Sequence, residues 1–119
     1  MAESPITPAQ AALCAKHAAS GLAALPDQKV GLARDFSRQV LPLNGLRHPP
    51  EAGTTGWFIW SGEELSQSPD FFMPVHVAHL DALAPEVVPF LALPPGWRFL
   101  IAGEYEDVWF DPSLIDQAD

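Results

Sequence analysis

The sequence predicts an α+β fold in which a mainly antiparallel sheet carries an N-terminal helix and two short helices on one face. Three observations predict it. Two apolar runs, each opening with Gly-Trp and closing with Gly-Glu, are typical of core strands. A helix-start motif stands near the amino end, and an apolar segment divided by Pro85 suits two short helices. The 119 residues are enough for one domain, which we expect to span the whole chain, 1–119.

The N-terminal helix is predicted by a capping box. Thr7 can serve as the N-cap, Pro8 occupies the first helical position, and Gln10 can return a hydrogen bond to the cap. We expect the helix to end at Gly21 or Pro26. Steps of three or four residues then define its packing stripe, which consists of Ala11, Cys14, Ala18, Leu22 and Leu25.

The middle of the chain is expected to alternate strands with long loops. Residues 30–43 favour one or two strands. The Asn-Gly and Pro-Pro pairs and the Gly-Thr-Thr-Gly motif of 44–56 predict a loop that exposes Arg47 and His48. The segment "GWFIWSG" is apolar at nearly every position, which is typical of a strand covered on both faces. Alternation places Trp57 and Ile59 on one face of that strand, with Phe58 and Trp60 on the other.

The second half of the chain is expected to hold a loop, two short helices and a hairpin. Residues 66–74 predict the loop, and 75–93 predict the helices, which Pro85 divides. The run "GWRFLIAG" predicts a strand with one face more fully buried than the other. "GEYED" then predicts a tight acidic turn, after which 108–110 return as the hairpin partner.

Charge is unevenly distributed along the chain. The net charge is −9, but residues 51–119 carry twelve acidic side chains and a single basic one, Arg98. Such a field repels nucleic acid and anionic membranes and speeds encounter with a basic partner. A plain solvated surface that keeps the protein soluble would produce the same composition.

The amino-terminal apolar stretch does not have the pattern of a secretion signal. It lacks a positively charged start, Leu13 rather than a small residue precedes Cys14, and Lys16 and His17 interrupt the apolar run. With one cysteine no intramolecular disulfide can form. We therefore expect a cytoplasmic protein, and the sequence leaves its oligomeric state open.

Motifs for metal or nucleophilic chemistry are absent from the sequence. His76 and His79 have a spacing that can place two imidazoles together, but a zinc site needs further ligands that no motif supplies. Cys14 lies on the predicted inner stripe and is expected to be structural. Ser61 lacks the Gly-x-Ser-x-Gly elbow of serine hydrolases. We expect no metal, no cofactor and no catalytic residue.

Two interpretations of the carboxylates remain. Glu63 with Glu64, and Glu104 with Glu106 and Asp107, could form an acid and base pair, as in a carboxylate-dependent hydrolase. The same residues could instead form the negative rim of a binding surface. Aromatic side chains next to these acidic segments would then act as anchors, although any of the tryptophans can be core residues. The candidate anchors are Trp57, Trp60, Tyr105 and Trp109.

Residues 55–110 resemble bacterial immunity protein family 33, formerly a domain of unknown function. The segments that carry the resemblance are "TGWFIWSGEE", "SPDFF" and "LAPEVVPFLALPPGWRFLIAGEYEDVWF", in that order. Residues 1–28, with the first helix, lie outside it. Where the family pattern often continues with a run of acidic residues, this chain has "LSQSPD", so the resemblance does not identify a particular toxin.

The resemblance implies a non-enzymatic immunity protein that binds a co-produced bacterial toxin and blocks its active site or its access to substrate. The acidic carboxyl-terminal half suits a toxin with a basic surface. A small-molecule or peptide-binding accessory domain is the alternative function. The residues that we expect to contact the partner, as turn residues pushed outward by the core, are Glu63, Glu64, Glu104, Tyr105, Glu106 and Asp107.

Overall fold

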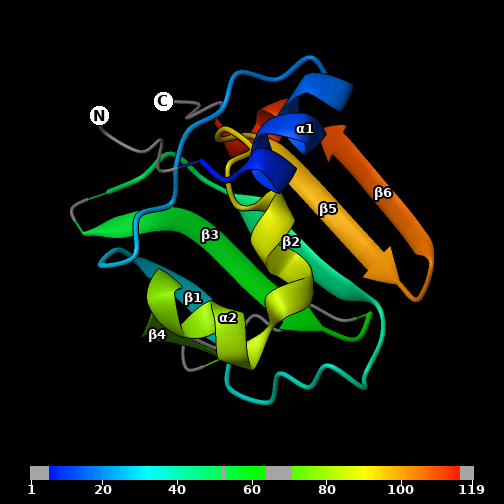
Figure 1. The fold of residues 1–119 in the computed structure, drawn as a ribbon. Coiled ribbons are helices and arrows are strands. Elements are labelled where there is room, and N and C mark those ends of the chain that lie inside the picture. Colours follow the sequence, from blue (N-terminus) through cyan, green and yellow to red (C-terminus); the bar gives the residue numbers. More distant parts are fainter. Residues whose placement is uncertain (1–5, 52, 64–70, 116–119) are drawn as a thin grey trace.

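A six-stranded sheet forms the centre of the computed structural model, which describes residues 6–51, 53–63 and 71–115. The strand order is β4-β1-β3-β2-β5-β6, so β4 and β6 form the two edges (Figure 1). All neighbouring strands are antiparallel except β1 and β3, which are parallel. The strands are β1 (Lys29–Ala33), β2 (Leu43–Arg47), β3 (Thr54–Ser61), β4 (Phe72–His76), β5 (Trp97–Ala102) and β6 (Tyr105–Phe110). The predicted α+β class with a mainly antiparallel sheet is confirmed.

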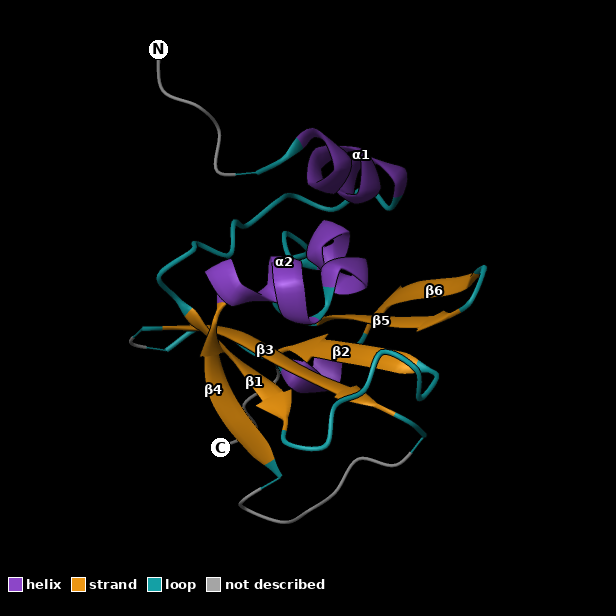
Figure 2. Cartoon of the chain, turned by 60° about the horizontal axis from the view of Figure 1, so that its bottom comes forward, coloured by secondary structure: helices purple, strands orange, loops and turns teal. Residues whose placement is uncertain are grey.

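Helices cover one face of this sheet (Figure 2). They pack on a core that contains Trp57, Ile59 and Phe99, while a short 3₁₀ turn places Leu114 in a smaller cluster on the opposite face. The helical elements are α1 (Pro8–Lys16), η1 (Val77–His79), α2 (Leu80–Leu83), η2 (Pro85–Phe90) and η3 (Pro112–Leu114). No helix in the described part of the chain has the length and apolar character needed to cross a bilayer.

The predicted capping box of α1 is present. The Gln10 amide donates to Thr7 Oγ1 at 3.1 Å, and the Thr7 amide donates to Gln10 Oε1 at 3.0 Å. The predicted end of the helix, however, is wrong. α1 stops at Lys16 because Ala18 takes a left-handed conformation, with φ 54°, and Ala19 N–H donates to Cys14 O at 2.9 Å. This Schellman arrangement needs no glycine, so the sequence did not signal it.

The shorter helix also changes its packing stripe. Cys14 is buried as expected, whereas Ala11 and Ala18 are exposed, and Leu22 and Leu25 lie beyond the helix with exposed side chains. Gln10 is buried instead, and its side-chain amide donates to Val88 O at 2.8 Å. Burial raises the pKa of the Cys14 thiol, which keeps it protonated and unreactive at neutral pH.

β3 is the core strand that alternation predicts. Trp57 and Ile59 enter the cluster under the helices, and Trp60 and Phe58 belong to the cluster on the opposite face. Trp57 is 1% exposed, and its indole N–H donates to Leu91 O at 2.9 Å. Trp60 is therefore a core residue and cannot anchor a partner.

The predicted loop at 44–56 is wrong, because β2 and the start of β3 occupy most of it. Arg47, which we expected at the surface, is 1% exposed. Its guanidinium donates to the carbonyls of Thr55, Leu22 and Leu93 at 2.8 Å and of Leu91 at 3.1 Å. Burial lowers the pKa of Arg47 to about 10, which still leaves it charged at neutral pH. Arg47 thus links β2, by hydrogen bonds, to three segments that are distant in sequence, at Leu22, Thr55 and 91–93.

Three further predictions need adjustment. His48 is half-buried, with Nδ1 3.3 Å from Leu114 O, rather than a surface residue. The segment 30–43 was expected to form one or two strands, but β1 ends at Ala33 and β2 begins only at Leu43. The loop expected at 66–74 ends early, since β4 starts at Phe72 and continues to His76, and residues 66–70 lie outside the described residues. Edge strands tolerate proline, so Pro74 did not rule this strand out.

The two short helices divided at Pro85 are present, since α2 ends at Leu83 and η2 begins at Pro85. The helical segment starts at Val77 and not at 75 as expected, because Val75 and His76 belong to β4. β5 covers the second Gly-Trp run, with Phe99 buried among the helices. Its hairpin partner β6 is present but begins at Tyr105, three residues earlier than expected.

Candidate partner-binding surface

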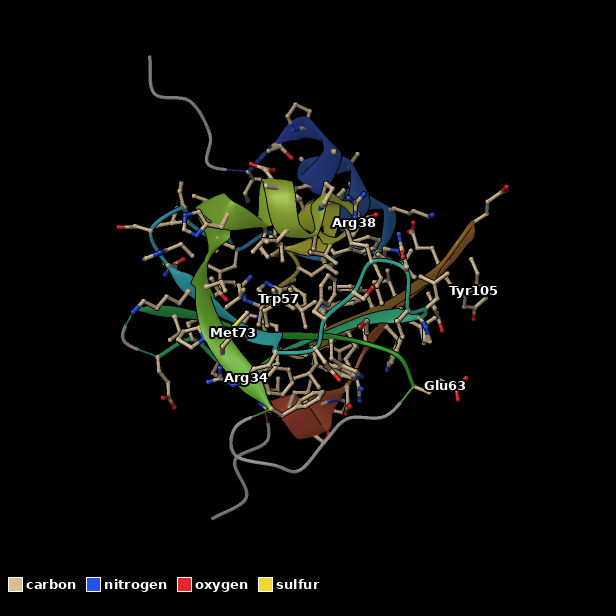
Figure 3. The ribbon with its side chains drawn as sticks, turned by 90° about the horizontal axis from the view of Figure 1, so that it is seen from below. Arg34, Arg38, Trp57, Glu63, Met73 and Tyr105 are labelled. Carbon is tan, nitrogen blue, oxygen red and sulfur yellow. The ribbon has the colours of Figure 1, made fainter. Side chains whose placement is uncertain are left out.

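The two acidic segments lie at the same end of the sheet. The strand registers pair Ser61 with Leu43, Leu43 with Ile101, and Ile101 with Glu106, so these four residues form one row across β3, β2, β5 and β6. Glu63 lies two residues beyond Ser61, just after the end of β3. Figure 3 shows its side chain and that of Tyr105 projecting outward on the same side of the molecule.

The hairpin turn is tighter than predicted. β5 ends at Ala102 and β6 starts at Tyr105, so only Gly103 and Glu104 form the loop. Gly103 has φ 62°, which a two-residue hairpin loop favours. The prediction that Tyr105, Glu106 and Asp107 are turn residues is therefore wrong.

Strand geometry divides these three residues between two faces. Glu106 pairs with Ile101 and lies on the helix side of the sheet, whereas Tyr105 and Asp107, paired with Ala102 and Leu100, lie on the other side. All three are exposed, with Tyr105 at 60%. The acidity of the segment suggested a turn, although strand-forming tyrosine, valine and tryptophan stand in the same stretch.

Glu63 and Glu104 are exposed as expected, and Glu64 lies outside the described residues. None of the carboxylates of Glu63, Glu104, Glu106 and Asp107 forms a salt bridge with a basic side chain in the described part of the chain. Their charge is consequently directed to solvent. An incoming cation would not have to displace a described internal partner.

Two apolar side chains at this end were missed by the sequence analysis. Val40 and Leu41 are 49% and 47% exposed. They precede Pro42, whose carbonyl accepts a hydrogen bond from Gly62 N–H at 2.9 Å. This hydrogen bond brings the segment that contains Val40 and Leu41 next to the segment that contains Glu63. Sequence periodicity could not show their exposure, because they belong to the stretch that favoured strands.

We call this region the acidic end and define it by the described residues Val40, Leu41, Glu63, Glu104, Tyr105, Glu106 and Asp107. It combines exposed apolar side chains and one exposed aromatic ring with a carboxylate rim. Protein interfaces commonly have this composition, with an apolar and aromatic centre and a polar margin.

The carboxylates of the acidic end come from two places in the sheet. Glu63 follows β3, whereas Glu104, Glu106 and Asp107 belong to the hairpin of β5 and β6, and β2 and β5 lie between β3 and β6. Carboxylate-dependent glycoside hydrolases place their two acids on either side of a substrate cleft. Glu63 and Glu106 are both exposed, and neither lines the pocket of about 740 Å³ or the pocket of about 500 Å³ near β1.

Behind the tip of the hairpin, Trp109 is only half-buried. The Arg98 guanidinium carbon lies 5.4 Å from the centroid of its indole ring, and Arg98 Nη1 lies 3.2 Å from Asp111 Oδ2. Hydrogen bonds from Ser113, with a smaller contribution from Arg98, lower the pKa of the Asp111 carboxyl. The Arg98 guanidinium therefore covers part of the Trp109 ring. Of the four predicted aromatic anchors, Tyr105 is the one whose side chain is exposed.

Two pockets lie near β1. One of about 740 Å³ is lined in part by Arg34, Arg38 and Glu86, and Arg38 Nη2 is 2.7 Å from Glu86 Oε2. The other, of about 500 Å³, is lined in part by Phe58 and Phe72. No group of three or more metal-binding side chains occurs in residues 6–51, 53–63 and 71–115.

Comparison with protein families gives one match. The model of the Imm33-like domain matches residues 9–111. The matched range is longer than the resemblance seen in the sequence and includes most of α1, which lay outside that resemblance. Comparison with curated proteins finds no match, and comparison with solved structures finds none either.

Proposed function

The chain belongs to the Imm33-like family, and from this premise we propose that it is an immunity protein that binds a cognate bacterial toxin and neutralises it without catalysis. The observation that carries the proposal is the acidic end. Exposed carboxylates with no basic partner among the described residues lie there together with Tyr105, Val40 and Leu41.

Neutralisation would follow from occupation of a basic cleft on the toxin. Enzymes that act on phosphate-containing substrates present cationic clefts, and a rigid acidic surface can compete with the substrate there. Tyr105 and the Val40–Leu41 pair would supply contact area that excludes water. The carboxylates would mainly steer the encounter and reject partners with negative surfaces.

The proposal is tested with a candidate toxin, which is sought among the proteins encoded beside this gene. Purified toxin is titrated with purified protein while toxin activity is followed. We expect complete inhibition at a molar ratio near one, because a binding inhibitor is consumed with its target. Inhibition by a small fraction of an equivalent would indicate enzymatic inactivation, and lack of inhibition would contradict the immunity function for this pair.

The surface is tested with matched charge reversals. Glu63→Lys and Glu106→Lys change the acidic end, whereas Glu51→Lys makes the same change in the β2–β3 loop at the opposite end of the sheet. We expect the first two to weaken the complex more than the third. Equal effects would move the contact surface away from the acidic end.

A second candidate function is supported by the pocket of about 500 Å³. Its lining includes Phe58, Phe72, Lys29 and His48, a mixture of aromatic and polar groups that small ligands or peptides use. Ligand binding there would shift the NMR signals of Phe58 and its neighbours and leave those of Glu106 unchanged. The opposite pattern would exclude this pocket as the site of that ligand.

A further inference from the structure

The two edge strands of the sheet differ in their ability to accept another strand. On β4, Pro74 is paired with Gly31 and has no N–H, so the outer edge of β4 lacks a donor at its centre. β6 has six residues and contains no proline. Within the described residues, no strand pairs with its outer side.

The hydrogen-bond pattern identifies the outward backbone groups of β6. Asp111 N–H donates to Gly96 O, so this pair is of the hydrogen-bonded class. Antiparallel pairs alternate between that class and the non-bonded class, which assigns Glu106, Val108 and Phe110 to the latter. The N–H and C=O groups of these three residues therefore point away from β5, toward the free edge.

Charge restricts what can occupy this edge. Glu106 and Asp107 are adjacent and exposed and lie on opposite faces of the strand. An added strand would meet a carboxylate on each face, which favours lysine or arginine in the incoming segment. Pairing with β6 of a second copy in a register that sets Asp107 opposite Asp107 or Glu106 opposite Glu106 would bring like charges together, and this disfavours self-association in those registers.

We propose that an extended basic segment of the partner adds to the sheet as a seventh strand along β6. The inference rests on the proposed function and specifies how the toxin is held. The three outward residues supply backbone donors and acceptors, the carboxylates select basic side chains, and exposed Tyr105 and Phe110 supply apolar contact at the two ends of the strand.

The first test uses a short synthetic peptide of alternating lysine and valine, with amide hydrogen exchange of the full-length protein followed by NMR. Strand addition should slow exchange at Glu106, Val108 and Phe110 and leave Tyr105 and Asp107, which face β5, unchanged. Protection without this alternation, or no protection up to the solubility limit of the peptide, would overturn the proposal. Protection that grows with protein concentration alone would assign the edge to a second copy and would also overturn it.

The control peptide has the same sequence and charge but carries N-methyl groups on alternate amides. It cannot complete the ladder, so we expect its affinity to fall about tenfold or more, because several backbone hydrogen bonds are lost together. Equal affinity of the two peptides would show that side-chain charge alone holds them. This comparison leaves the protein unaltered and so does not depend on the stability of any variant.

The second test uses the toxin and a matched pair of variants. Glu106→Gln removes the charge, and Glu106→Pro removes the charge and the outward N–H while leaving the bonds to β5 in place. Strand addition predicts clearly weaker toxin binding by the proline variant than by the glutamine variant. Equal binding by the two would overturn strand addition and leave the immunity function standing, whereas a toxin that the unaltered protein fails to bind would count against the function itself.

Discussion

The two Gly-Trp segments have similar sequences and different environments. In β3, the first segment, Trp57 and Trp60 are buried on opposite faces. In β5, the second segment, Phe99 is buried beneath the helices, while Leu100 on the other face is only half-buried. The difference comes from position, because β3 has two strands on one side and three on the other, whereas only the edge strand β6 lies outside β5. An apolar pattern therefore identifies a strand without showing how many of its faces are covered.

The largest effect is expected in β3. Trp57→Ala should lower the free energy of unfolding by about 3–5 kcal/mol, because it empties a volume enclosed by the helices and removes a buried hydrogen bond to Leu91 O. Chemical denaturation of the purified variant measures the loss. A change below about 1 kcal/mol would contradict the assignment of β3 to a core covered on both faces.

Arg47→Met should have a comparable effect, of about 3–5 kcal/mol, since four carbonyls would lose a charged donor in a buried site. Arg47 and Trp57 share Leu91 O as an acceptor, so their losses should not add in the double variant. Denaturation of both single variants and of the double variant measures this coupling. Strict additivity would indicate that the two side chains act independently.

Trp109→Ala sharpens the comparison by making the same substitution in the hairpin. We expect a smaller loss, about 1–2 kcal/mol, because the ring is half-buried and contacts Arg98 at its face. The same denaturation measurement applies. A loss equal to that of Trp57→Ala would mean that the hairpin is as enclosed as the centre of the sheet.

The smallest effect on stability is expected at the acidic end. Glu106→Lys combined with Asp107→Lys should change the free energy of unfolding by less than about 0.5 kcal/mol, since both side chains are exposed and have no basic partner among the described residues. Thermal unfolding checks this. A large loss would show that these carboxylates support the fold, and their use as a binding surface would then be doubtful.

Local patterns predicted the elements whose determinants lie close together in sequence. The capping box at Thr7 and the alternation of 57–60 depend on neighbours within a few residues. The environment of Arg47 does not, because its acceptors come from Leu22, Thr55 and the segment 91–93. No local signal could have shown that this cation is buried.

The candidate surface could be predicted only in part, because its arrangement depends on contacts between segments that are distant in sequence. Acidic residues after core strands were expected to reach the surface, and the described ones do. Their arrangement depends on strand register, which sets Glu63 and the hairpin tip at one end and divides Tyr105 and Glu106 between two faces. The exposure of Val40 and Leu41 depends on how the chain enters β2, which apolar periodicity does not show.

The measurement that tests the central claim most directly is the association rate constant with the toxin at low and at physiological salt. The pair Glu106→Lys and Asp107→Lys should slow association about tenfold at low salt, and the difference should shrink as salt screens the charges. Glu51→Lys, at the opposite end of the sheet, should change the rate by less than about twofold. Equal rates for the unaltered protein and the Glu106–Asp107 variant at low salt would contradict binding through the acidic end.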